Sequence, residues 1–294
     1  MKLFLQLLVN GLVNGALYAM LAVGFGIIWR SLRVFHIAYG GLFVVCSYVF
    51  YVFASKVGLP ILPAILLTLV CSAGAGWGVE LALYRPFYRR HASSGAVLIA
   101  SLGTLVILEN VTALIFGNEL QTVSRGIART WHLGPIIQIQ LQLVQFGVGV
   151  GVVALLWALV RKLRLFKALW AMGDQPELIP VLGLPLRHLR SIALIVGTML
   201  AALPASLICL DVGIDPHTGM SYLLIATVAV LVGGLNSYMG WVCGAMTLAI
   251  LQSLVVWKFS ARWMDLVTFA LLVVILLFRP QGLLARLQRV EETT

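Results

Sequence analysis

Nine apolar segments follow one another along this chain of 294 residues, with basic or polar stretches between them. Most are about 20 residues long, the length that an α-helix needs to cross a hydrocarbon layer of about 30 Å. Backbone polar groups must be paired inside such a layer, and a continuous helix pairs them within the segment. The sequence therefore predicts an all-α integral membrane protein, a polytopic helix bundle of about eight or nine transmembrane segments. The predicted segments are residues 3–29, 34–54, 60–83, 96–116, 142–160, 191–210, 220–234, 239–257 and 265–279.

The composition excludes an ordinary soluble domain. Hydrophobic residues make up 61% of the chain and charged residues only 10%, whereas about a quarter of the residues in a soluble protein are charged. The net charge of +10 could attract nucleic acid, but the basic residues gather in loops beside the apolar segments, as in proteins that face lipid headgroups. We therefore expect membrane lipid as a partner and no nucleic acid. No linker is evident, so we expect one transmembrane domain over residues 1–294.

Loop charges predict the orientation, because loops rich in Lys and Arg stay in the cytoplasm. The loops 84–92 and 161–190 and the tail after residue 279 are basic, whereas 211–219 contains acids and no Lys or Arg. The basic loops are therefore predicted to be cytoplasmic and 211–219 external. Counting back places the N-terminus and the longest external loop, 117–141, outside. In that loop IIQIQLQLV alternates apolar and polar residues, which predicts a short strand or hairpin.

The first apolar segment resembles a signal peptide, because Met1 and Lys2 precede it. It continues to Trp29, which is too long for the apolar core of a signal peptide, and no clear cleavage site follows. We therefore expect a retained first helix. The 220–234 segment is short for a full crossing and could instead be re-entrant.

The cytoplasmic loop 161–190 is basic and helix-forming. Asp174 fits a helix N-cap, Glu177 lies three residues later, and Gly183 can end a short helix. A capped helix that projects from the cytoplasmic side of a membrane protein is a docking element for a soluble partner. This loop is therefore the strongest functional signal in the chain.

Glycine pairs at four-residue spacing occur in four of the apolar segments. Small residues allow helices to approach closely in lipid, although glycine is also common in membrane helices in general. Together the pairs predict a compact bundle. They are Gly11/Gly15, Gly74/Gly78, Gly147/Gly151 and Gly240/Gly244.

Polar residues inside the apolar segments are candidates for a substrate pathway. Asn10, Asn14 and Tyr18 recur every four residues and so share one helix face; packing between helices and lining of a pathway explain them equally well. Glu109 lies next to Asn110 well inside a segment, where a carboxylate costs a few kcal/mol and must face protein or water. Glu109 is therefore either a pathway residue or a hydrogen-bonded acid between helices.

The stretch from Arg30 to Gly41 interrupts the apolar pattern. His36, Tyr39 and a glycine pair follow Arg30 and Arg33, which predicts a broken helix whose backbone could line a cavity. A plain cytoplasmic turn is the competing explanation for the two arginines. His36 and Tyr39 join the candidate pathway residues.

No catalytic motif occurs in the sequence. The patterns GxxxxGK[ST], HExxH, GxSxG and CxxC are all missing, and the five histidines are dispersed. Cys46, Cys71, Cys209 and Cys243 fall in or beside apolar segments, which is typical of small buried side chains. We expect no catalytic residue, metal or cofactor, so the energy for any pumping must come from a gradient or from another protein.

Seven segments carry, in order, short motifs that occur together in one family. They are NGLVNGALYAMLAVGFGIIW (10–29), FHIAYG (35–40), VELALYRPFYRR (79–90), ASLGTLVILENVTALIFG (100–117), RLFKALWAMGDQPELIPVLGL (164–184), VLVGGLNSYMGWVCGA (230–245) and RPQGLLAR (279–286). Through them nearly the whole chain resembles the permease subunit of bacterial ABC-type branched-chain amino acid importers, the Liv type. Several positions depart from the family pattern: His36, Tyr39, Glu109, Phe166, Trp170, Leu178, Ile179 and Asn236.

The resemblance implies a division of labour. Two permease subunits, identical or different, would form the path through a bacterial inner (plasma) membrane. Two cytoplasmic ABC ATPases would hydrolyse ATP, so the permease itself would not be an enzyme. A periplasmic or extracellular binding protein would deliver a branched-chain amino acid or a related small amino acid or amide.

The resemblance also implies a coupling helix, at about residues 171–183, that sits in a groove of the ATPase. Leu178, Ile179 and Leu182 are the expected apolar anchors in that groove. The full set of expected coupling residues is Ala171, Asp174, Glu177, Leu178, Ile179, Leu182 and Gly183.

Two other functions remain as alternatives. A stand-alone secondary transporter or channel for a small polar solute could use Glu109 as a proton-coupled acid, but it would not need a docking helix in the 161–190 loop. A non-transport scaffold is the third interpretation, and the polar residues Asn10, Asn14 and Glu109 argue against it.

Overall fold

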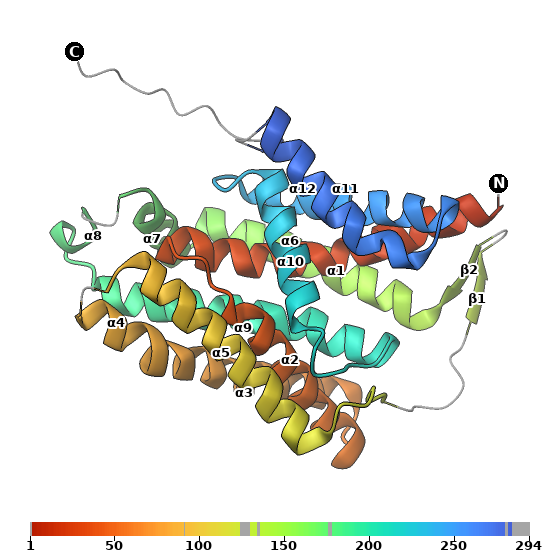
Figure 1. Cartoon of the computed structure of the whole chain (residues 1–294), viewed down its shortest axis with the longest axis horizontal. Coiled ribbons are helices and arrows are strands. Elements are labelled where there is room, and N and C mark those ends of the chain that lie inside the picture. The colour runs from red at the N-terminus through yellow and green to blue at the C-terminus, as the bar shows by residue number, and fades with distance from the viewer. Residues whose placement is uncertain are drawn as a thin grey trace.

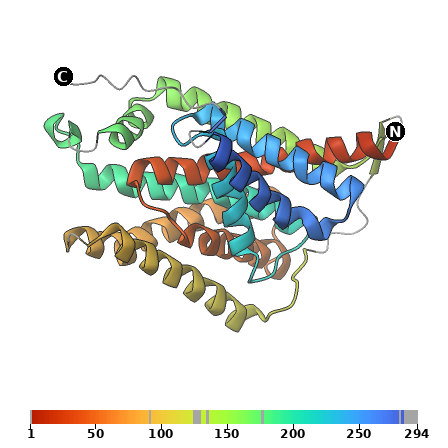
Figure 2. The same cartoon turned by 45° about the horizontal axis from the view of Figure 1, so that its top comes forward.

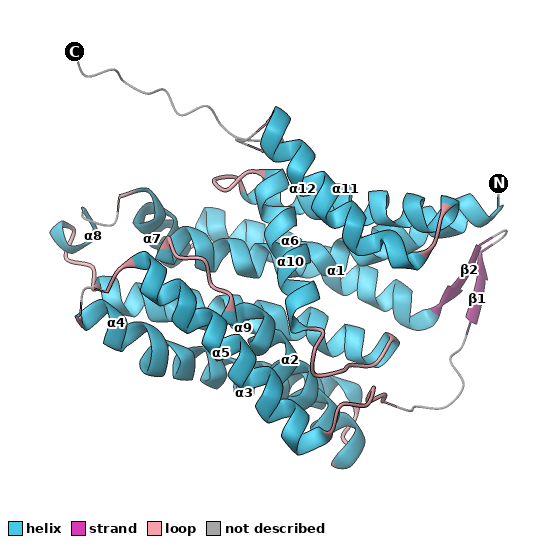
Figure 3. Cartoon of the chain, in the orientation of Figure 1, coloured by secondary structure: helices cyan, strands magenta, loops and turns pink. Residues whose placement is uncertain are grey.

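The computed structural model describes residues 2–90, 92–123, 130–133, 136–175, 178–279 and 282–283, and most of these are helical (Figure 3). The elements are α1 (Lys2–Leu32), α2 (Ala38–Tyr51), α3 (Ile61–Val79), α4 (Arg85–Arg89), α5 (Ser94–Phe116), β1 (Thr130–Leu133), β2 (Ile136–Ile139), α6 (Gln140–Lys162), α7 (Arg164–Asp174), α8 (Leu178–Val181), α9 (Leu186–Asp211), α10 (Gly219–Gly233), α11 (Tyr238–Lys258) and α12 (Met264–Phe278). Short π-helical or 3₁₀ turns extend α2 (Val52–Lys56), follow α3 (Glu80–Tyr84) and precede α12 (Ala261–Trp263).

Eight helical segments of the described residues are long and apolar enough to cross a membrane. The remaining apolar helix, α10, has 15 residues, which gives a length of only about 22 Å. Figure 1 shows α10 crossing the other helices steeply. The predicted all-α polytopic bundle is therefore confirmed, and the segment that the sequence marked as short forms a short helix that crosses α1 steeply.

The two ends of the bundle differ as the loop charges predict. The N-terminus and the β1–β2 hairpin lie at one end, and α4, α7 and α8 lie at the other (Figure 1). The same separation is seen in the turned view of Figure 2. The two strands pair antiparallel, with Thr130 opposite Ile139. The predicted hairpin therefore forms, but its second strand ends at Ile139, and the rest of the alternating segment is the start of α6. A backbone bridge between Gln121 and Ile214 joins the loops after α5 and α9 at the hairpin end.

Helix α1 lies at the centre of the bundle and packs against α6, α9, α10 and α11. Helices α3, α5, α6 and α12 surround this core and expose large apolar side chains, such as Leu62, Leu114 and Phe278. An apolar outer surface is the arrangement that lipid requires.

The helix break predicted between Arg30 and Gly41 lies at residues 33–37. Arg33 has a φ of +52°, and α2 begins at Ala38, whose backbone N–H donates to Ser101 Oγ at 2.9 Å. At Gly40 a Cβ would lie 2.4 Å from the carbonyl oxygen of Gly219. Glycine is therefore required where α2 meets the first turn of α10.

Only two of the four glycine pairs pack inside this chain. A Cβ at Gly11 would lie 2.7 Å from Ser253 Oγ on α11, and a Cβ at Gly244 would lie 2.1 Å from the carbonyl oxygen of Ala229 on α10. The other two pairs, Gly74/Gly78 and Gly147/Gly151, lie on outward faces. Among the described residues, no atom beyond the adjacent residues and the nearby backbone of the same helix comes within 4 Å of an added Cβ there. These two pairs therefore do not contribute to helix packing within this chain.

Gly244→Ala should lower the free energy of unfolding by about 2 kcal/mol or more, because the added methyl group collides with backbone rather than with a movable side chain. Gly78→Ala is the matched control from an outward-facing pair, and it should change that free energy by less than about 1 kcal/mol. Thermal unfolding of both variants in detergent provides the measurement. Equal melting temperatures would contradict the packing role of Gly244.

Candidate functional site

Helix α7 lies across the end of the bundle and buries one face. Phe166, Leu169 and Met172 are buried, at spacings of three residues that place them on one side of a helix. The neighbouring positions Lys167, Ala171 and Asp174 are exposed. This amphipathic pattern makes α7 a helix that rests on the bundle with its other face exposed.

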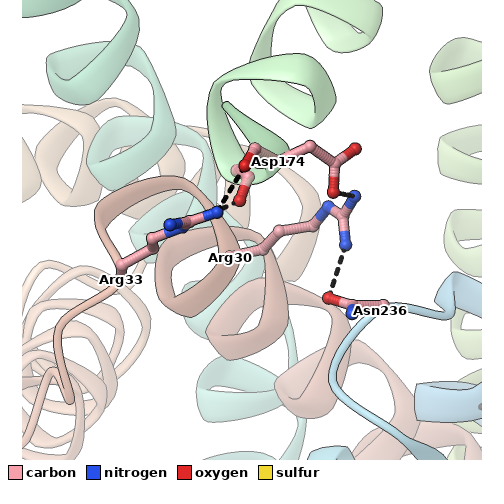
Figure 4. A network of polar contacts seen from close by, with 5 residues as sticks. Arg30, Arg33, Asp174 and Asn236 are labelled. Carbon is pink, nitrogen blue, oxygen red and sulfur yellow. Dashed lines mark hydrogen bonds and ion pairs between the residues drawn. The ribbon is translucent and has the colours of Figure 1, made fainter. Parts of the chain in front are cut away.

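Arg30, near the end of α1, joins α7 to the turn between α10 and α11 (Figure 4). Its Nη2 donates to Asp174 Oδ1 and its Nη1 donates to Asn236 Oδ1, each at 2.8 Å. The guanidinium also lies 4.2 Å from the ring centroid of Trp170. Only 6% of Arg30 is exposed, so its charge depends on these partners rather than on water.

A second arginine, Arg33 directly after α1, holds the end of α7. Arg33 donates from Nε to the carbonyl oxygen of Gly173 at 2.9 Å and from Nη2 to the carbonyl oxygen of Asp174. Carbonyl groups at a helix C-terminus lack partners within the helix, and a cation there is favourable. At Gly173 a Cβ would lie 2.6 Å from Arg30 Cγ. Glycine therefore allows α7 to close on α1.

An aromatic contact supports the same junction. Trp170 on α7 and the fully buried Trp241 on α11 have ring centroids 5.5 Å apart. Beside the arginines a pocket of about 270 Å³ opens, lined by Trp29, Arg30, Arg33, Gly173, Asp174, Leu235 and Asn236. We call the contacts among Arg30, Arg33, Gly173, Asp174 and Asn236 the arginine junction.

The structure corrects the predicted role of Asp174 and the extent of the coupling helix. Asp174 is the last residue of α7 rather than an N-cap, because Arg30 binds its side chain and Arg33 its carbonyl group. The single helix expected at about 171–183 is instead divided between the end of α7 and α8. Gly183 does end a helix as predicted: its φ is +73°, and its N–H donates to the carbonyl oxygen of Pro180.

The apolar residues expected to meet a partner differ in exposure. Ile179 is buried within this chain, with only 1% exposed, so its side chain is not available to an ATPase in this conformation. Leu182 is 69% exposed and Val181, which sequence reasoning had not singled out, is 80% exposed. Glu177 and the Leu178 side chain lie outside the described part of the structure. The exposed apolar tip is therefore formed by Val181 and Leu182.

Two of the predicted pathway residues, Glu109 and Tyr18, lie beside α10, whereas Tyr39 of α2 contacts α1. A Cβ at Gly219 would lie 2.6 Å from Glu109 Oε1, so this carboxylate is placed at the positive N-terminus of α10. The backbone N–H of Met220 faces the same carboxylate. Tyr18 of α1 packs against a cluster formed by Ile225, Val228 and Val232 of α10 and Leu248 of α11. Tyr39 is buried, and its hydroxyl donates to the carbonyl oxygen of Leu21 at 2.9 Å.

The other predicted pathway residues are dispersed. His36 is completely buried in the turn before α2, where its Nδ1 pairs with the hydroxyl of Tyr84, and burial lowers its pKa to about 3. The imidazole is therefore neutral at physiological pH. Asn110 is exposed on α5 and donates to the carbonyl oxygen of Val106. Asn10 and Asn14 are half-buried on α1.

Sequence reasoning missed the arginine junction. Arg30 and Arg33 had the competing explanation of a cytoplasmic turn, and Trp170 and Asn236 were noted only as departures from a family pattern. Their separation in sequence, 206 positions between Arg30 and Asn236, hides the contact. Among the described residues, no three His, Cys, Asp or Glu side chains are grouped so as to hold a metal ion.

The family model described as branched-chain amino acid transport system / permease component matches residues 7–276. The chain belongs to this permease family. It is 26% identical to the high-affinity branched-chain amino acid transport system permease protein BraD of Pseudomonas aeruginosa, over 96% of both chains. It is also 26% identical to LivH of Escherichia coli, again over 96% of both chains.

A solved structure shares the fold of this permease. PsaBC from Streptococcus pneumoniae in complex with Fab aligns with a TM-score of 0.51 and 16% identity, over 95% of this chain and 92% of that one. At that identity the likeness concerns the fold alone. The family match and the eight long apolar helices of the described residues make the permease a multi-pass membrane protein of the ABC transporter type.

Gly173→Ala should loosen α7 from α1, because the added methyl group meets Arg30. We expect amide hydrogen exchange in α7 to become at least about tenfold faster, the effect of weakening local packing by about 1–3 kcal/mol. Ala171→Ser on the exposed face of α7 is the control and should leave exchange within about twofold of the unaltered permease. Unchanged exchange in Gly173→Ala would contradict the close contact.

Proposed function

We propose that this permease is the membrane-spanning subunit of an ATP-driven importer for branched-chain amino acids or related small amino acids or amides. It forms the path through a bacterial inner membrane, and separate cytoplasmic ABC ATPases hydrolyse ATP. The observation that carries this proposal is the family match across residues 7–276. The permease proteins BraD and LivH, which belong to branched-chain amino acid transport systems by name, support the substrate class.

The α7–α8 end supports a cytoplasmic partner. Val181 and Leu182 present exposed apolar side chains beyond an α7 that two arginines fix to the bundle. Exposed apolar side chains held in place by a packed helix are suited to bind an apolar groove in another protein. We assign this groove to the ATPase subunits, one for each of two permease subunits.

The opposite end is suited to substrate delivery. The β1–β2 hairpin and the bridged loops after α5 and α9 lie there, and a periplasmic or extracellular binding protein would dock on them. From that end the substrate would pass near α10, where Tyr18 and Glu109 lie, at the contact with a second permease subunit.

The stand-alone transporter remains the second candidate, and Glu109 is the observation that favours it. A carboxylate inside a membrane segment is a candidate for proton coupling. Its position at the N-terminus of α10 gives Glu109 a structural role that does not need proton transfer. The two functions differ in what the purified chain does without an ATPase.

Vesicles that contain this permease alone should not accumulate leucine, isoleucine or valine against a gradient, with or without a proton gradient. Addition of the ATPase subunits, a second permease subunit and the binding protein of the same system should produce uptake that requires ATP. Radiolabelled amino acid inside the vesicles is the measurement. Accumulation by the permease alone would establish the secondary transporter instead.

Leu182→Asp should weaken binding of the ATPase at least about tenfold, because burial of one leucine side chain contributes about 1.5–3 kcal/mol. Val181→Asp should act in the same direction. Leu120→Asp, a similarly exposed apolar position near the opposite end, is the matched control and should leave binding unchanged. Co-purification and titration of the ATPase measure the effect, and equal binding by all three variants would rule out docking at the α8 tip.

A further inference from the structure

We propose that Arg30 is a positioning residue that transmits movement of α7 to the α10–α11 turn during transport. This inference rests on the proposed function. It concerns the mechanical link inside the permease, not the contact with the ATPase.

The geometry of Arg30 makes it a link between two segments. A guanidinium is planar and presents its donors in a fixed fork. Nη2 of Arg30 binds Asp174 on α7, and Nη1 binds Asn236 in the α10–α11 turn, both at 2.8 Å. A shift of either acceptor must therefore move the fork, and the other acceptor with it, or break a charge-assisted hydrogen bond.

On one side of the link, α7 and the end of α1 behave as one body. Gly173 approaches the Arg30 backbone so closely that a Cβ would lie 2.7 Å from its carbonyl oxygen. Arg33 binds the last carbonyl groups of α7. A force applied to α7 from the cytoplasm therefore reaches Arg30 directly.

On the other side, the turn that holds Asn236 is fixed to α10 and α11. A Cβ at Gly233 would lie 2.0 Å from the carbonyl oxygen of Gly240, so the two helices meet backbone to backbone. Leu283 N–H donates to the carbonyl oxygen of Val232 at 2.7 Å. Movement of the turn must therefore carry α10 with it.

Helix α10 connects the arginine junction to the candidate pathway. Its last residue, Gly233, precedes the turn that contains Asn236, and its first residue, Gly219, lies against Gly40 and Glu109. A short helix without internal glycine or proline is stiff, so a displacement at one end reappears at the other. Helix α10 therefore connects the arginine junction at its C-terminal end to the Glu109 region at its N-terminal end.

A purely structural role for Arg30 makes a different prediction. Loss of a structural contact reduces the amount of folded complex, whereas loss of a transmitting contact leaves the complex assembled and separates ATP hydrolysis from transport. The ratio of substrate imported to ATP hydrolysed distinguishes the two. Asn236 is suitable for this test because it is exposed and lies in a turn, so its replacement leaves the buried core intact.

The experiment uses the complete complex in vesicles. It compares the unaltered permease with Asn236→Ala, Asp174→Ala and the double variant. Each single variant should lower the ratio of leucine imported to ATP hydrolysed about tenfold. This is the fold-change that corresponds to the free energy of one charge-assisted hydrogen bond. Because both substitutions act through Arg30, the double variant should lose clearly less than the product of the single losses.

Two control variants distinguish loss of the Arg30 contact from a general effect of surface charge, and the yield of complex reports on folding. Asn236→Asp keeps an oxygen acceptor for Arg30 and should stay within about twofold of the unaltered ratio. Lys162→Gln removes an exposed positive charge at the end of α6 near the same end of the bundle and should leave the ratio unchanged. The yield of assembled complex is measured for every variant.

An unchanged ratio in either single variant, or losses that multiply in the double variant, would overturn the role of Arg30. So would a fall in yield that accounts for the whole loss of transport. If the unaltered complex shows no ATP-dependent uptake, the proposed function fails and this inference fails with it. ATP-driven uptake by the unaltered complex with intact coupling in the variants would overturn this inference alone.

Discussion

The buried guanidinium of Arg30 requires partners, and that requirement organises the end of this permease where α7 and α8 lie. A charge removed from water is tolerated only where opposite charge and hydrogen-bond acceptors surround it. Asp174, Asn236 and the face of Trp170 supply them. These partners come from α7 and from the α10–α11 turn, so satisfying one side chain brings together the end of α1, the amphipathic helix α7 and the α10–α11 hairpin.

Close backbone contact is the second constraint, and it governs the region within lipid. Helices in a bilayer gain little from the hydrophobic effect against each other and depend on close packing. Gly233, Gly240 and Gly244 allow α10 and α11 to touch, and Gly40 and Gly219 allow α2 and α10 to touch. Helix α10 is therefore held tightly at both ends. It joins the arginine junction to Glu109, which gives a physical basis for communication between the two ends of the bundle.

Two departures from the family pattern meet at the same side chain. Trp170 and Asn236 were separate differences in sequence, and in space both contact Arg30. Asp174 illustrates the opposite situation, because its local sequence fits an N-cap. Its tertiary partners, Arg30 and Arg33, place it at a helix C-terminus instead. Local capping preferences contribute about 1 kcal/mol, and a buried charge outweighs that preference.

The sequence alone determined the membrane class, the approximate bounds of the apolar helices, the break after α1, the hairpin strand and the family. Hydropathy, residue alternation and ordered motifs are local or additive signals, so they can be read without the fold. Only the tertiary structure decided which glycine pairs pack inside the chain, that Ile179 is buried while Val181 and Leu182 are exposed, and that Glu109 lies at the N-terminus of α10. Only it joined Arg30 to Asp174 and Asn236. These outcomes depend on which faces of distant helices meet, and a helix period of 3.6 residues specifies a face without specifying what lies opposite it.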